Sequence, residues 1–393
     1  MTTVKHFHSA MSGAPVLNGT AGSLIAVLDA CLQDGFGLKA ASGIAVASGV
    51  ATVSFANGHS FEPDTIALIA GATPGALNGE KVVLTTSTNT ITFAAAGIAD
   101  GAATGTISAK LAPAGWEKAF SGTNAAAYRS LDPESTRMFL RVDDSSPTNA
   151  RVVGYESMSD VNTGVGPFPT AAQISGGGWW PKADGANATA RAWTLVSDSR
   201  GFILHMHTAA NNLGASGCVW AFGDFASLKS GDAYSSVLHC NPNDGAASSG
   251  VQSASVEWCG AAPLAGGVYA PRSFTALGGS SALNHGVDSL GGISAVAGAG
   301  PGSGYTPSYP NGPDNGLILA RKVFVEPGVC LRGRLPGVMV PLQNCHSAFS
   351  WRDKIDGQGD LTGRKLIAIK CGAPAVAASQ GMLLLDVTGP WSR

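Results

Sequence analysis

Two histidines that share one face of a predicted strand form the clearest metal-binding pattern in this sequence. His205 and His207 lie at positions i and i+2 of GFILHMHTA, and His239 precedes Cys240 on another predicted strand. Side chains two residues apart on a strand project from the same face, but a zinc site would need a third or fourth ligand to converge on them. We favour the simpler interpretation, in which both imidazoles lie on the wet face of a half-buried strand. No metal and no cofactor are therefore predicted.

Four acidic residues suggest a second kind of chemistry, the hydrolysis of sugar polymers by paired carboxylates. They are Asp143, Asp144, Glu156 and Asp160. Each lies in or beside a turn sequence, where acidic and amide side chains favour hydrogen bonds to the backbone. The sequence also has no GxSxG, GxxxxGK[ST] or HExxH motif. We therefore expect a protein that is not an enzyme, with no catalytic residue.

Three tryptophans are the candidate residues for binding. Trp179 and Trp180 follow the three glycines 176–178, and Trp220 lies on a later predicted strand. The glycines should let the backbone turn sharply before the two large rings. Each tryptophan is either a core residue or an anchor that contacts another subunit or stacks on a sugar ring.

The composition indicates a loop-rich β protein that works inside an assembly. Of the 393 residues 45% are hydrophobic and only 13% are charged, with 53 glycines and a formal net charge of −2. This charge disfavours nucleic acid as a partner, and so few charges favour a surface that is largely covered by neighbours. The seven cysteines are odd in number and widely spaced, which fits folding in a reducing cytoplasm. No secretory signal and no membrane span are expected.

One amphipathic helix is predicted near the N-terminus, in TAGSLIAVLDACLQDGFG. Thr20 or Ser23 could be its N-cap, and Gly35 is in the position of a left-handed C-cap. Its apolar stripe consists of Leu24, Val27, Leu28, Cys31 and Leu32.

The predicted fold is mainly β, a large β-sandwich or meander-type domain with that helix and an inserted small all-β module. Six short strands separated by turns predict the module at residues 39–113. The main domain then comprises 1–38 and 114–393, with a Gly/Pro-rich arm near 295–316. Within it, residues 143–149 should form a hairpin loop and residues 158–170 a long loop.

The sequence resembles structural proteins of tailed bacteriophages. HSFEPDTIALIAGATPGALNGEKVV, NTITF and GAATGTISAK, between His59 and Lys110, are similar to a small β module common in phage tail proteins. GWEKAFSGTN, RMFLRVDD, GYESMSDVNTGVGPFP, FGDFAS, RGRLPGVMVPL and LLLDVTGPW resemble an uncharacterised family of phage virion proteins.

The resemblance implies a virion component that is assembled in the host bacterial cytoplasm. Its partners would be copies of itself, other virion proteins and a host cell-surface receptor. We place it in the tail, at the tip or baseplate. The alternatives are a head-surface or head-to-tail connector protein, or a tail module that binds a receptor or saccharide.

Overall fold

The computed structural model describes residues 3–210, 217–243, 264–288, 309–343, 345–372 and 380–393. These residues are mainly β, with four antiparallel sheets and one α-helix. The predicted fold class is confirmed.

The largest sheet has thirteen strands, in the order β1-β17-β18-β19-β21-β22-β23-β24-β25-β28-β27-β26, with β20 paired to β25. It curls back on itself, because Gly217, just before β19, forms a bridge with Cys371 of β27. The strands are β1 (Lys5–His8), β17 (Trp193–Ser197), β18 (Gly201–Met206), β19 (Cys218–Asp224), β20 (Ala226–Ser227), β21 (Ser236–His239), β22 (Leu264–Ala270), β23 (Ser281–Asp288), β24 (Leu319–Glu326), β25 (Cys330–Pro341), β26 (Lys354–Asp356), β27 (Lys365–Gly372) and β28 (Gln380–Asp386).

A six-stranded sheet and the helix cover one side of this large sheet. The helix α1 (Ser23–Leu28) continues without a break into a π-helical segment, Asp29–Asp34. The strands of the six-stranded sheet are β11 (Trp116–Gly122), β12 (Ala125–Ser130), β13 (Phe139–Asp143), β14 (Asn149–Asp160), β15 (Thr163–Phe168) and β16 (Gly178–Pro181). The predicted hairpin loop at 143–149 is present between β13 and β14.

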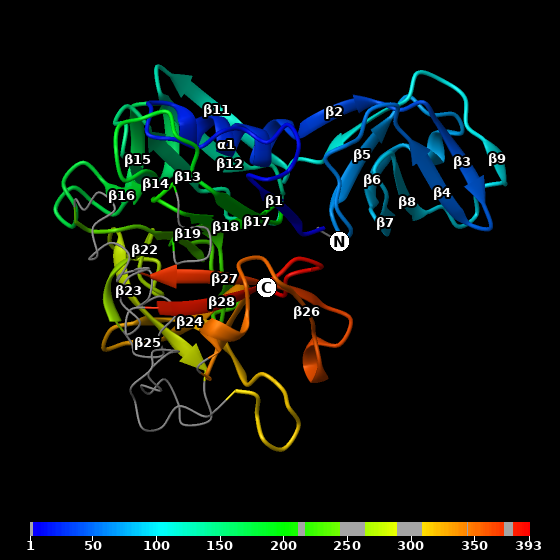
Figure 1. The fold of residues 1–393 in the computed structure, drawn as a ribbon. Helices are drawn as coiled ribbons and strands as arrows, with labels where there is room; N and C mark the ends of the chain where they lie inside the picture. The colour runs from blue at the N-terminus through cyan, green and yellow to red at the C-terminus, as the bar shows by residue number, and fades with distance from the viewer. Residues whose placement is uncertain (1–2, 211–216, 244–263, 289–308, 344, 373–379) are drawn as a thin grey trace.

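Two smaller sheets make up a module that projects to one side of the rest of the chain (Figure 1). Their orders are β2-β10-β5-β6 and β7-β8-β4-β3-β9. The strands are β2 (Phe36–Ala40), β3 (Gly43–Ala47), β4 (Val50–Ser54), β5 (Ile66–Ala70), β6 (Gly79–Val82), β7 (Thr85–Thr86), β8 (Thr90–Ala94), β9 (Gly101–Ala102) and β10 (Ser108–Leu111).

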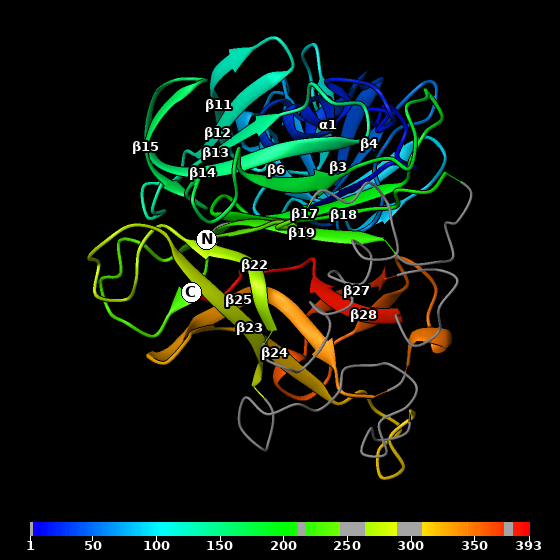
Figure 2. The ribbon, with the colours of Figure 1, turned by 90° about the vertical axis from the view of Figure 1, so that its left-hand side faces the viewer.

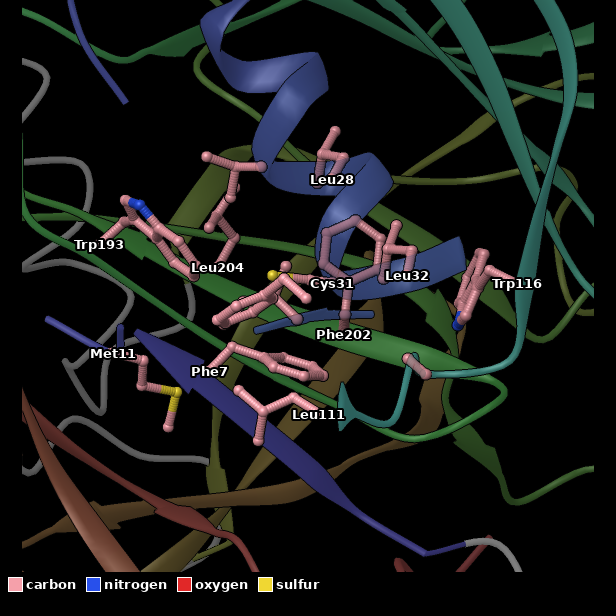
Figure 3. Close-up of a cluster of buried hydrophobic side chains, with 14 of the residues drawn as sticks. Phe7, Met11, Leu28, Cys31, Leu32, Leu111, Trp116, Trp193, Phe202 and Leu204 are labelled. Carbon is pink, nitrogen blue, oxygen red and sulfur yellow. The ribbon is translucent and has the colours of Figure 1, made fainter. Parts of the chain in front are cut away.

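Strands β17, β18 and β19 form a middle layer that is covered on both faces (Figure 2). Phe202 and Leu204 of β18 point into the core shared with the helix, where Leu28, Cys31 and Leu32 pack (Figure 3). Ile203, between them in the sequence, points into a second core with the C-terminal strands. All of β18 is buried as a result.

The N-cap of the helix differs from the prediction. The residue before it is Gly22, and neither Thr20 nor Ser23 caps it with a side chain. Instead, Oδ2 of Asp144 accepts hydrogen bonds from the backbone N–H groups of Leu24 (2.8 Å) and Ile25 (3.4 Å). The cap therefore comes from a residue about 120 positions away in the sequence. Gly35 does end the helical segment with a positive φ of 70°.

The prediction of a long loop at 158–170 is wrong, because most of this segment is a strand. β15 pairs with β14 from Gly154 opposite Phe168 to Asp160 opposite Thr163. Its glycines are needed for packing: a Cβ at Gly164 would lie 2.5 Å from the Tyr155 ring, and one at Gly166 would lie 2.6 Å from the Glu156 side chain. The glycines indicated a loop but in fact make room for the neighbouring strand.

Residues 295–308 of the predicted Gly/Pro-rich arm near 295–316 lie outside the described residues. In the part that is described, Asn311 Nδ2 donates to Asp314 Oδ1 (2.7 Å) and closes a turn.

Candidate ligand-stacking and subunit-contact site

Two of the three candidate tryptophans are core residues. Trp180 and Trp220 are fully buried, and their rings stack with centroids 6.4 Å apart. The indole N–H of Trp180 donates to the backbone carbonyl of His239 (2.8 Å). Neither ring can stack on a ligand or a neighbouring subunit, so only Trp179 remains a candidate.

The three glycines before Trp179 set its position. Gly176 and Gly177 have φ values of 72° and 91°, which glycine adopts without strain. A Cβ at Gly177 would lie 2.6 Å from the Val152 carbonyl, and one at Gly178 would lie 2.2 Å from Cys240 Sγ. The sharp turn predicted from the sequence is present, and it brings β16 into contact with β14.

Trp179 is half-buried and its ring is covered on one face by Arg151. The guanidinium carbon lies 3.5 Å from the ring centroid, the geometry of a cation–π contact. Arg151 also donates to the backbone carbonyls of Ser175 and Gly177, the latter at 2.6 Å. Sequence reasoning missed this arginine, although its β14 position lies directly opposite Trp179 in the strand pairing.

A shallow depression of about 490 Å³ lies beside Trp179. It is lined by Asp143, Ser145, Ser146, Thr148, Asn149, Arg151 and Trp179. Asn149 is 5% exposed, and its side-chain oxygen has no hydrogen-bond partner among the described residues. A buried acceptor without a partner is costly, and this oxygen is itself shielded from solvent.

The chemistry of the depression suits a ligand with many hydroxyl groups. It offers a carboxylate, an amide and several hydroxyls beside one aromatic ring. Partial burial alone would raise the pKa of Asp143, but hydrogen bonds from Ser145 hold that pKa below its usual value. Asp143 is therefore ionised at neutral pH and can accept hydrogen bonds from hydroxyl groups.

The acidic residues considered for glycoside hydrolysis each have a protein partner. Glu156 binds Arg272 through two hydrogen bonds of 2.7 Å. Asp160 is on the surface, where its carboxylate accepts a hydrogen bond from the backbone of Asn162 (2.7 Å). Asp144 is buried against Lys182.

The histidines predicted on a wet strand face are buried instead. His205 and His207 are at most 1% exposed, because β18 is covered by a layer on each face. His205 Nε2 donates to the Lys370 carbonyl (2.7 Å), and the His207 ring meets Trp351 with centroids 4.8 Å apart. Among the described residues, no three His, Cys, Asp or Glu side chains are grouped to hold a metal ion.

The pair Asp144 and Lys182 was not predicted. Both side chains are completely buried, and Lys182 Nζ contacts Asp144 Oδ1. Lys182 Nζ also donates to the Thr20 carbonyl (2.7 Å). The loop after β13, the segment before α1 and the residue after β16 are joined at this point. Lys182 follows Pro181 in an unremarkable polar sequence, so no local signal marks it.

Comparison with protein-family models and with curated proteins gives no match. None of the helices in the described residues is both long and apolar enough to span a membrane.

Proposed function

We propose that this chain is a non-enzymatic structural component of a tailed-bacteriophage particle, placed in the tail at its tip or baseplate. It acts through contacts with its own copies and with other virion proteins. The observation that carries the proposal is the architecture: an all-β module projects from a larger β body (Figure 1). Such a module can reach a neighbour while the layered body keeps its shape.

Three connections at one end of the large sheet provide a surface for such contacts. Their exposed apolar side chains are Leu228 (56%), Leu277 (74%) and Val329 (54%). The connections are tied together: Phe274 N donates to Glu326 Oε2 (2.8 Å), and Leu228 N donates to the Arg332 carbonyl (3.0 Å). Apolar side chains held on ordered loops lose little entropy when a neighbour covers them.

We expect the double variant Leu277→Asp with Val329→Asp to enter particles at least about tenfold less than the wild type, because a carboxylate buried without a partner weakens a contact. Quantitative mass spectrometry of purified particles measures this. Val16→Asp is the matched control, since Val16 is 56% exposed but lies far from these connections in the sequence. Equal incorporation of all three proteins would contradict this contact surface.

Imaging of the particle at side-chain resolution tests the location directly. Density for the chain at the tail tip or baseplate is the expected result. Density on the head surface or at the head-to-tail connector would move the protein to one of the alternative positions, and its absence from particles would overturn the proposal.

The second candidate function is recognition of a cell-surface saccharide, which the depression beside Trp179 favours. Trp179→Ala should weaken adsorption of the purified protein to host-cell envelope polysaccharide about tenfold or more, since it removes the aromatic wall. Tyr234→Ala is the matched control, because Tyr234 also has an arginine over its ring, with the carbon of Arg272 at 4.5 Å, outside the depression. Equal adsorption by both variants would exclude this saccharide site.

A further inference from the structure

Asp144 and Lys182 meet in a place that water does not reach. The exposed fraction of each side chain is 0%, and Lys182 Nζ contacts Asp144 Oδ1. The two residues lie on different connections, one after β13 and the other after β16, so the contact depends on the complete fold of the six-stranded sheet. Their geometry is fixed before any reaction takes place.

The remaining polar contacts hold each group in a defined orientation. Oδ2 of Asp144 accepts hydrogen bonds from the backbone N–H groups of Leu24 (2.8 Å) and Ile25 (3.4 Å). Nζ of Lys182 donates to the Thr20 carbonyl (2.7 Å). One carboxyl oxygen is therefore held by two N–H donors, while the other faces the amine.

Burial also moves both groups towards their neutral forms. It raises the pKa of Asp144 and lowers the pKa of Lys182, and in each case it outweighs the attraction between the two partners. A neutral amine has the lone pair that a nucleophile needs, and a neutral carboxylic acid has a leaving group that can depart as water.

We propose that Lys182 and Asp144 become joined by an intramolecular isopeptide bond. The lone pair of Nζ attacks Cγ of Asp144, and the negative charge that develops on Oδ2 is stabilised by the N–H groups of Leu24 and Ile25. Oδ1 then leaves as water, taking the carboxyl proton and one proton from the amine. An amide and one water molecule are formed, and no oxidant, reductant or other reactant is needed.

The fold favours this reaction in two ways. It holds the reacting groups in contact, which raises their effective concentration far above that of free molecules in solution. It also excludes water, which would otherwise hydrate the amine and the acid. The bond would tie the loop after β13 to the end of β16, in a chain whose six described cysteines are free thiols. This inference does not depend on the proposed place in a phage particle.

Intact-mass spectrometry of the fully denatured full-length protein tests the proposal. The expected mass is lower than that of the sequence by one water molecule. Proteolysis should then release a branched peptide that contains both Asp144 and Lys182. Lys182→Arg should restore the full mass of its sequence, since a guanidinium is not a nucleophile at neutral pH.

Asp144→Asn provides a matched variant, because the same amide would form with loss of ammonia instead of water. Full wild-type mass with two separate peptides would overturn the proposal and leave a non-covalent buried pair. Loss of water that persists in Lys182→Arg would also overturn it, since that result indicates a cyclic imide at an aspartate. The wild-type measurement alone decides the question if a variant fails to fold.

Discussion

Arg332→Met is expected to lower the free energy of unfolding by about 3–5 kcal/mol, because it leaves two carboxylates buried without their cation. Arg332 is 1% exposed at its side chain, Asp232 is 2% and Glu326 is 7%. Its guanidinium donates to both oxygens of Asp232, at 3.1 and 3.3 Å, and to Glu326 Oε2 at 3.2 Å. Urea unfolding at neutral pH measures the change.

Arg334→Met is the matched control for this prediction. Arg334 lies two residues further along β25, but its side chain is 41% exposed and, among the residues that the structure describes, it forms an ion pair with Asp288 alone. A partly exposed pair of this kind contributes about 1 kcal/mol or less. Combining Arg332→Met with Glu326→Gln should recover part of the loss, because one of the uncompensated charges is removed. Equal losses for Arg332→Met and Arg334→Met would show that the buried cluster adds nothing to stability.

The second large effect expected is loss of stability between pH 7 and pH 5. Burial lowers the pKa of His6 and of His239 to about 3, and it lowers the pKa values of His205 and His285 well below the ordinary 6.5. These groups stay neutral in the folded protein, whereas the unfolded chain binds protons below about pH 6.5. The contribution of these histidines to the free energy of unfolding is complete above about pH 6.5 and is lost as the pH falls towards 3.

Each such histidine should lower the free energy of unfolding by about 2 kcal/mol between pH 7 and pH 5. The pKa of Glu62 is about 2, chiefly because of its hydrogen bond from His8. The contribution of this acid to stability is therefore lost only below the range from pH 7 to pH 5. The histidines should therefore dominate this range.

Urea unfolding at pH 7 and pH 5 measures this dependence. In His239→Gln the free energy of unfolding should fall by about 2 kcal/mol less between pH 7 and pH 5 than in the wild type, since the titrating group is gone. A wild-type protein with equal stability at both pH values would contradict the assignment of these histidines as neutral buried groups.

Local patterns in the sequence predicted most of the regular structure. The apolar stripe from Leu24 to Leu32 predicted the helix, and the hairpin loop at 143–149 was also predicted. The prediction of the helix N-cap was wrong, because the capping side chain is Asp144, a residue that only the complete fold brings to Leu24. Glycine and proline in the segment 158–170 indicated a loop, whereas those glycines accommodate Tyr155 and Glu156 on the adjacent strand.

The candidate site could be predicted only in part, for a related reason. Trp179 and Trp180 are adjacent in the sequence and alternate across β16, so one ring is buried and the other faces outward. Neither the sequence spacing nor the composition shows which ring is which. The burial of His205 and His207 also depends on the layers on both sides of β18, and a strand covered on both faces cannot be recognised from one strand's pattern alone.

The middle layer restricts how this chain can change in length. Along β18, Phe202 and Leu204 belong to one core, while Ile203 and His205 face the other side. Inserting or deleting one residue here would exchange the two sets and place a histidine where a large apolar side chain is needed. Relatives of this protein should therefore keep β17 to β19 at constant length and differ in length at the outer connections.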